Sequence, residues 1–285
     1  MLERRGALVT CLNSKDGHKV VLKASLGRDP LSKYLIQAES IALEVLRGLA
    51  VPKRIPFSRT KAIKILGTQR FYHLAMEWVP EKPSSGRTFS TAQGIALWAF
   101  ALEQMCAFRR KKVIYTDLKS DHICVSDDMT KAKFIDFDSC IMLEPSGRYP
   151  TMAFRYTANL SAPELYFSKM HSENVVVYQM GMLLGSLLLK SLSNSDLNDK
   201  TLEKIKMKFR KADCHPLYAL FEKCISKSPV VRPKNLDSLF QKINSISLPK
   251  ESYEIWNKLR APYRKELLKV GFKDPTSDVF QLKAS

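Results

Sequence analysis

The stretch VIYTDLKSDHICVSDDMTKAKFIDFDSC, residues 113–140, decides the fold and the chemistry of this chain. It contains two apolar runs, ICV and KFIDF, whose β-branched and aromatic residues are typical of buried strands. Asp117 and Lys119 precede the first run, and Asp136 and Asp138 end the second. The acid–lysine pair is suited to holding a hydroxyl group against a phosphate, and a carboxylate at a strand end is suited to binding the metal ion on that phosphate.

The rest of the chain has the composition of a globular protein. It has 285 residues, of which 45% are hydrophobic and 26% are charged, enough to bury a substantial core. The longest apolar stretch, residues 175–189, is shorter than the roughly 20 residues of a membrane span, and it contains Gln179. The N-terminal sequence has no apolar region of signal-peptide length. We therefore expect a cytoplasmic protein with no transmembrane segment.

The chain is strongly basic, with 46 lysines and arginines against 28 acidic residues and a formal net charge of +18. Basic residues cluster at 109–112 and again at 204–211. One interpretation is that these are solvated helix faces. The other is a docking surface for an acidic protein or an anionic lipid, with nucleic acid as the less favoured partner. The sequence leaves these interpretations open.

The first part of the chain predicts a small unit rich in strands. Alternating or apolar runs predict strands at 8–12, 19–24, 61–66 and 71–78. Between the second and third of these, apolar residues at helical spacing predict a helix over 31–49.

A joint rich in proline and serine, PEKPSS at residues 80–85, separates this unit from a helical part. The expected helices of that part cover residues 91–110, 175–189, 199–211, 216–226 and 235–246. The last segment, 248–285, has apolar residues at roughly helical spacing interrupted by Pro262. We expect it to pack on the helical part, and the alternative is a helix that binds a partner or a membrane. The pattern predicts an α+β fold with a small β-rich lobe containing one helix, a hinge, and a larger helical lobe.

Four further segments accompany the 113–140 stretch in a definite order. They are Val21-Leu22-Lys23 with Glu39 on the following helix, LAMEWVP at 74–80, Ser161-Ala162-Pro163-Glu164, and Arg232-Pro233. In this order they resemble the motifs of eukaryotic-type protein kinases, and the similarity covers residues ~8–246.

The resemblance implies a nucleotide site between the lobes. Lys23 is expected to hold the α- and β-phosphates of ATP, with Glu39 as its ion-pair partner. Met76 is expected to lie behind the adenine, whose edge the backbone from Glu77 to Val79 would read. These roles are implied by the resemblance to the family. A single lysine on a strand, or a buried strand, does not by itself indicate nucleotide binding.

The resemblance also implies the catalytic roles. Asp117 is expected to accept or orient the substrate hydroxyl, and Lys119 to neutralise charge on the γ-phosphate, as in serine/threonine kinases. Asp136 is expected to chelate the Mg²⁺ or Mn²⁺ that bridges the phosphates. Thr157 is similar in position to a threonine that contacts the catalytic acid and lysine, and Arg232 to the arginine that pairs with a buried glutamate.

The chain departs from the family pattern at several places. His122 stands where the family has the asparagine that ligates a second metal ion, and imidazole suits Mn²⁺ better than Mg²⁺. Asp138 replaces a glycine and is a candidate to compensate as a metal ligand. Thr116 replaces the arginine that pairs with a phosphorylated activation loop. Val176 replaces an aspartate that supports the catalytic loop, and only Gly6 is left of a glycine-rich loop.

These features predict a kinase domain over 1–247, with an N-lobe to about 79, a hinge at about 77–86 and a C-lobe at about 87–247, followed by a helical extension at 248–285. The expected function is ATP-dependent phosphotransfer to serine or threonine hydroxyls of a protein substrate. One alternative is a pseudokinase that acts as a scaffold or allosteric partner. A small-molecule kinase of the aminoglycoside or choline type is a third interpretation, which the match at 161–164 argues against.

Overall fold

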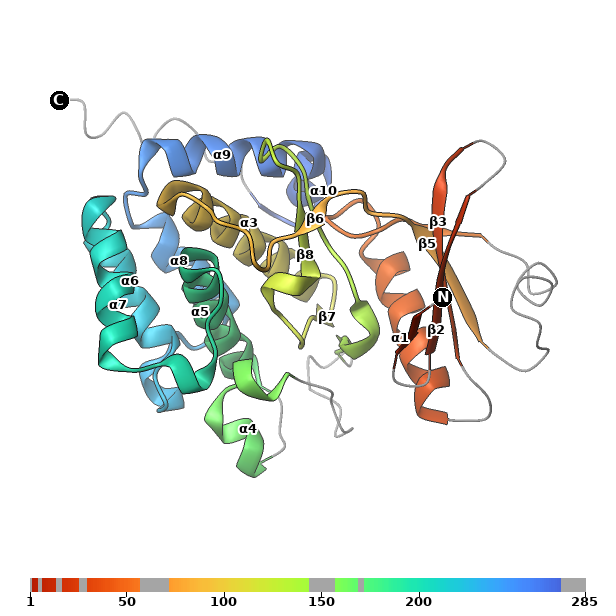
Figure 1. Ribbon diagram of the computed structural model, residues 1–285, viewed down its shortest axis with the longest axis horizontal. Helices are drawn as coiled ribbons and strands as arrows, with labels where there is room; N and C mark the ends of the chain where they lie inside the picture. Colours follow the sequence, from red (N-terminus) through yellow and green to blue (C-terminus); the bar gives the residue numbers. More distant parts are fainter. Residues whose placement is uncertain are drawn as a thin grey trace.

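The computed structural model of the chain describes residues 2–4, 7–13, 17–25, 30–56, 72–143, 157–168 and 172–272. These residues form a small lobe built on a β-sheet and a larger lobe built of helices (Figure 1). The two-lobed α+β architecture expected from the sequence is thereby confirmed.

The small lobe contains a five-stranded antiparallel sheet in the order β1-β2-β3-β5-β4. The strands are β1 (Leu2–Arg4), β2 (Ala7–Asn13), β3 (Lys19–Ser25), β4 (Arg54–Ile55) and β5 (His73–Glu77). Side chains alternate between the two faces of a strand, and in β3 Val20, Leu22 and Ala24 are buried. Lys23 therefore lies on the opposite face, where its side chain meets helix α1.

Helix α1 (Pro30–Val45) turns Glu39 toward this face of the sheet. The helix begins with proline, whose fixed φ and missing N–H suit a first helical position. It ends four residues before the predicted end at 49, and a turn with Gly48 at φ +88° follows. That conformation is costly for any residue with a Cβ atom, which explains why the helix stops near this glycine.

The predicted strands at 8–12, 19–24 and 71–78 are confirmed as β2, β3 and β5, with ends that differ by a few residues. The predicted strand at 61–66 lies outside the described residues. The two-residue strand β4 has no sequence signal, because it is too short to show a period. Strand β1 is also short, and Arg4 pairs with Ala7 across a two-residue connection.

Helices α3 (Thr91–Arg110) and α5 (Glu173–Leu189) form the centre of the large lobe. Ser90 caps α3 in a capping box with Gln93, and almost the whole surface of the helix is buried. The indole N–H of Trp98 donates to the carbonyl of Met180 at 2.7 Å, which joins the two helices. A helix that is apolar all round belongs inside a protein, so the stretch at 175–189 is a core helix.

The remaining elements surround this centre. The other helices are α4 (Pro163–Ser168), α6 (Asp199–Lys211), α7 (His215–Cys224) and α8 (Leu236–Asn244). The short strands are β6 (Lys82–Pro83), β7 (Val113–Ile114), β8 (Ile123–Val125), β9 (Ala132–Phe134) and β10 (Ile141–Met142). Strands β6, β8 and β9 form one sheet, and β7 and β10 form another. The predicted helices in this part are confirmed to within two residues at each end.

The extension continues as α9 (Lys250–Arg260), a 3₁₀ turn, and α10 (Arg264–Lys269), with Pro262 in the turn. Helix α9 packs on α3, where the guanidinium of Arg260 lies 2.8 Å from the carboxylate of Glu103. The side chains of this ion pair are 5% and 1% exposed. The described part of the extension is thus built into the large lobe. Every helix in the described part of the chain is too short or too polar to span a bilayer.

Candidate active site

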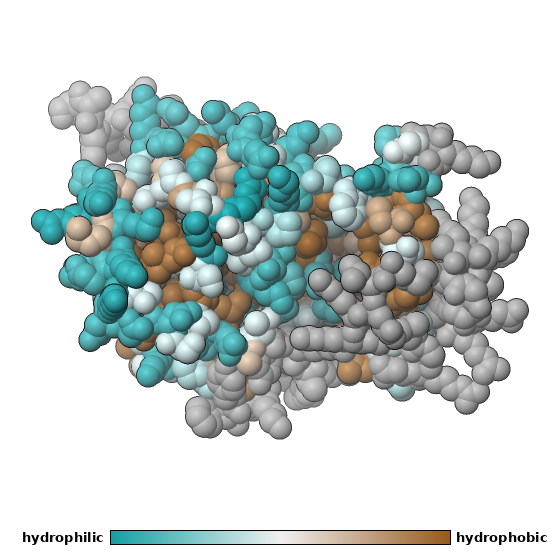
Figure 2. Space-filling model, in the orientation of Figure 1, coloured by the Kyte–Doolittle hydropathy of each residue, from teal (hydrophilic) through white to brown (hydrophobic). Residues whose placement is uncertain are grey.

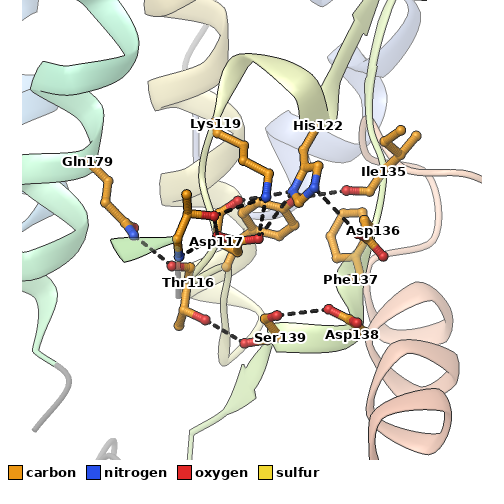
Figure 3. Close-up of polar contacts among 12 residues, drawn as sticks. Thr116, Asp117, Lys119, His122, Ile135, Asp136, Phe137, Asp138, Ser139 and Gln179 are labelled. Atoms are coloured by element: carbon orange, nitrogen blue, oxygen red, sulfur yellow. Dashed lines mark hydrogen bonds and ion pairs between the residues drawn. The ribbon is translucent and has the colours of Figure 1, made fainter. Parts of the chain in front are cut away.

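Two loops meet between the lobes. The first joins β7 to β8 and carries Asp117, Lys119 and His122, and the second joins β9 to β10 and carries Asp136 and Asp138. Both are placed by short buried strands, so that apolar packing holds the loop ends while polar side chains occupy the gap between them (Figure 3).

Lys23 connects the two lobes through its ammonium group. Its Nζ donates to both carboxylate oxygens of Glu39 at 2.9 Å and to Oδ1 of Asp136 at 2.8 Å. Burial opposes the charged form, but the charges of Glu39 and Asp136 outweigh it and raise the pKa of Lys23. Burial also raises the pKa of Glu39, which is 1% exposed, and the Lys23 charge opposes that shift. The structure thus brings together the three residues expected at the phosphate end of a nucleotide site.

Asp136 is held as a charged group in a strained backbone conformation. Its φ of +65° lies in the left-handed region, which residues other than glycine rarely adopt. Burial would raise the pKa of its carboxyl, but the Lys23 ammonium outweighs this and holds it at about 2. The next residue, Phe137, is fully buried against the ring of Tyr115, with 5.0 Å between ring centroids. This packing fixes the turn that directs Asp136 toward Lys23.

Asp117, Lys119 and Thr157 form a second polar cluster. Lys119 Nζ donates to Oδ2 of Asp117 at 2.9 Å and to the Thr157 hydroxyl at 3.0 Å. The Thr157 hydroxyl and its backbone N–H both donate to Oδ1 of Asp117, at 2.6 and 3.0 Å. Each Asp117 oxygen therefore has a fixed partner, and the carboxylate is held in one orientation. The structure brings the expected acid, lysine and threonine together.

His122 bridges the two clusters. Its Nδ1 lies 3.1 Å from the backbone carbonyl of Asp117, and a carbonyl can only accept, so this nitrogen carries the proton. The Tyr115 hydroxyl lies 3.0 Å from the same nitrogen and donates its own proton to the carbonyl of Ile135 at 2.6 Å. Burial lowers the pKa of His122. Its other ring nitrogen, Nε2, lies 3.4 Å from Oδ2 of Asp136.

Asp138, the third expected metal ligand, is not part of this arrangement. Its Oδ1 accepts a hydrogen bond from the Ser139 hydroxyl at 2.8 Å, and in Figure 3 it lies apart from the facing pair of His122 and Asp136. Within the described ranges, no three His, Cys, Asp or Glu side chains gather into a cation-binding group. The Asp138 side chain is turned to Ser139 in this structure, and its compensating role as a metal ligand stays a prediction.

The expected adenine-reading segment follows β5. Met76 is 4% exposed, and the N–H groups of Glu77 and Trp78 are occupied within the small lobe by the carbonyls of Lys53 and Lys19. The backbone of Val79, by contrast, makes no hydrogen bond to any residue that the structure describes. Its N–H and C=O are therefore available to a planar heterocycle. The Glu77 side chain is turned to Lys133, with both oxygens 2.7 Å from Nζ.

Two residues support the catalytic loop in ways that the motifs did not predict. The side-chain amide of Gln179, on α5, donates to the carbonyl of Thr116 at 2.8 Å. The Thr116 hydroxyl in turn donates to the carbonyl of Ser139 at 2.5 Å, which ties the two loops together. Gln179 thus holds the catalytic loop by a hydrogen bond, which the apolar side chain of Val176 cannot form. Its position inside an otherwise apolar helix was the one available signal in the sequence.

Arg232 and Glu164 form the expected ion pair in the large lobe. The guanidinium donates to both carboxylate oxygens, at 2.5 and 3.0 Å, and the Arg232 side chain is fully buried. Removing one partner of such a buried pair costs about 3–5 kcal/mol of folding free energy. This pair therefore supports the fold of the large lobe.

Three features occur together at this site: a lysine held by a helix carboxylate, an acid that faces this lysine from the second lobe, and an acid–lysine pair beside them. Their combination defines the kinase class of phosphotransferases. The chain matches the family model of the protein kinase domain over residues 4–246, and it belongs to this family. Protein kinase domains transfer a phosphoryl group from ATP and generally use Mg²⁺. A comparison with curated proteins found none that matches the chain.

Proposed function

We propose that this protein kinase transfers the γ-phosphoryl group of ATP to serine or threonine hydroxyls of a protein substrate. The observation that carries the proposal is the cluster in which Lys119 and Thr157 hold Asp117. A lysine two residues after the catalytic acid is the serine/threonine pattern of the family, and here its ammonium lies beside the acid. The Lys23–Glu39 pair, which is formed, supports an active arrangement of α1.

The chemistry asks little covalent work of the protein. Asp117 orients the substrate hydroxyl and accepts its proton as the hydroxyl oxygen bonds to the γ-phosphorus. The bond from that phosphorus to the β–γ bridging oxygen breaks, and ADP leaves with the electron pair. Lys119 stabilises the charge on the transferred group, and Lys23 holds the other phosphates.

A divalent cation fits the facing pair of His122 and Asp136. Nε2 of His122 and Oδ2 of Asp136 lie 3.4 Å apart, so that one cation would find a nitrogen and an oxygen ligand side by side. A bound cation would neutralise phosphate charge during transfer. An imidazole nitrogen beside a carboxylate favours Mn²⁺ over Mg²⁺, which prefers oxygen ligands. We therefore infer that Mn²⁺ supports this enzyme at least as well as Mg²⁺.

The test is phosphorylation of a mixed serine, threonine and tyrosine peptide library with ATP and either cation, followed by phosphoamino-acid analysis. Phosphoserine or phosphothreonine is expected, and Asp117→Asn is expected to lower turnover by at least about 10²-fold while nucleotide binding persists. Phosphotyrosine alone would contradict the substrate class. Nucleotide binding without turnover under every condition would favour the pseudokinase interpretation.

A further inference from the structure

Helix α6 carries a row of lysines along the side that borders the end of α5 and the start of α3. Its inner face is anchored by Ile205 and Phe209, both fully buried. The row consists of Lys200, Lys204, Lys208 and Lys211, of which Lys208 is half-buried and the others are exposed. Residues three or four apart share one face of a helix, so these four ammonium groups lie together along one side of α6.

The lysine row has no acidic partner among the residues that the structure describes. None of the four lysines forms an ion pair with any residue in the described ranges, and the nearby carboxylate of Glu203 lies 3.8 Å from a different lysine, Lys206. Like charges four residues apart destabilise a helix. An anionic partner would relieve the repulsion between these lysines.

The lysines border a groove with an apolar floor. Met207 of α6, Leu189 at the end of α5 and Thr91 at the start of α3 line it together with the lysine row, and its volume is about 650 Å³. Met207 is 41% exposed, so its side chain is accessible to a partner. Figure 2 shows hydrophobic surface bordered by hydrophilic side chains in this part of the large lobe. Methionine adapts its shape to different partners and is common at binding surfaces.

We propose that this groove binds an acidic segment of a partner protein, with carboxylates on the lysine row and an apolar side chain on Met207 and Leu189. Charge complementarity selects the partner: four lysines against one glutamate line the groove, on a chain with a net charge of +18. The concave, partly apolar floor suits a peptide better than the flat surface of a bilayer. The lining residues include neither arginine nor an aromatic ring, the residues that read or stack nucleic-acid bases.

The connection between α5 and α6 contacts the segment that holds Thr157. Asn194, which lies between α5 and α6, donates its side-chain amide to the carbonyl of Ser161 at 2.9 Å. A partner bound on α6 is therefore held by the lobe that also carries Asp117. The proposal concerns binding alone, and it stands whether or not the chain catalyses phosphotransfer.

The experiment measures binding of a fluorescein-labelled peptide in which blocks of glutamate flank a leucine, by fluorescence anisotropy and without nucleotide. A peptide with glutamine in place of glutamate is the ligand control. The groove variant is Lys204→Glu/Lys208→Glu. Its matched control, Lys227→Glu/Lys234→Glu, changes the net charge equally at two exposed lysines outside the groove. A third variant, Met207→Asp, tests the apolar floor. Circular dichroism and thermal melting verify that each variant is folded.

We expect the groove variant to weaken binding of the acidic peptide by at least about tenfold, and the control variant by less than about twofold. Met207→Asp is expected to weaken binding as well. Equal losses in the groove and control variants would overturn the proposal, because they would indicate attraction to net charge alone. Groove-dependent binding to phosphatidylserine vesicles without binding to the peptide would also overturn it, as would equal binding of the glutamine peptide.

Discussion

The Arg260–Glu103 ion pair predicts that the extension folds together with the kinase domain. Replacing Arg260 by methionine keeps the apolar length of the side chain but leaves the carboxylate of Glu103 buried, with the indole N–H of Trp256 at 3.3 Å as one of its remaining partners. Because both members of the pair are almost fully buried, the loss is expected to cost about 3–5 kcal/mol of unfolding free energy. At roughly 2–4 °C for each kcal/mol, the melting temperature should fall by about 6–20 °C.

The assay is urea unfolding of the full chain, followed by circular dichroism and by tryptophan fluorescence. Trp256 and Trp98 lie on α9 and α3, so a shared transition reports that the two helices unfold together. Lys258→Met is the matched control, because Lys258 is exposed on the same helix. Its effect should stay within about 0.5 kcal/mol.

A loss in Arg260→Met no larger than that of the control would refute this reasoning, as would an early separate transition for α9. The double variant Arg260→Met/Glu103→Met provides a further check. Replacing a buried ion pair by apolar side chains of similar volume is often neutral or stabilising, so the double variant should be more stable than Arg260→Met alone.

Four further outcomes follow from the structure. His122→Asn should raise the ratio of Mg²⁺-supported to Mn²⁺-supported turnover by about tenfold, as measured from kcat/KM with each cation, because it replaces an imidazole ligand by an amide oxygen. Asp138→Gly should leave Mn²⁺ affinity, measured by electron paramagnetic resonance, within about twofold, since the Asp138 side chain faces Ser139. Gln179→Leu should lower stability by about 1–3 kcal/mol in urea unfolding, because it leaves the buried carbonyl of Thr116 without its donor. The hydrogen bond from Lys111 lowers the pKa of Glu266 below its ordinary value of 4.5. The stabilisation by the Glu266 carboxylate is therefore complete above pH 4.5 and is lost as the pH falls through the lowered pKa. Glu266→Gln should flatten the acid side of a plot of unfolding free energy against pH.

The sequence predicted the elements and the residues whose meaning depends on spacing along the chain. Helix α3 was predicted to the residue because its apolar run begins after a capping serine and ends at two arginines. Lys23, Glu39, Asp117 and Asp136 could be selected because each occupies a definite place relative to a strand or helix. The structure joins the first two to Asp136, and His122 lies between Asp136 and Asp117.

The contacts that the sequence did not reveal join residues that are distant or have no motif. The hydrogen bond from Gln179 to Thr116 spans 63 positions, and the packing of Tyr115 beside His122 depends on where two strand ends meet. The hydrogen bond between Asp138 and Ser139 had no signal in the sequence either, and the metal-binding role of Asp138 stays a prediction.

The short β1–β2 hairpin has a consequence for the kinetics of the enzyme. Because only two residues connect Arg4 of β1 to Ala7 of β2, this connection offers little main chain to cover the phosphates of a bound nucleotide. Opening of a phosphate-covering flap is then not a slow step in ADP departure, and phosphoryl transfer itself is expected to limit turnover. Maximal velocity should accordingly be insensitive to added viscogen, and a pre-steady-state burst of phosphorylated product should be absent.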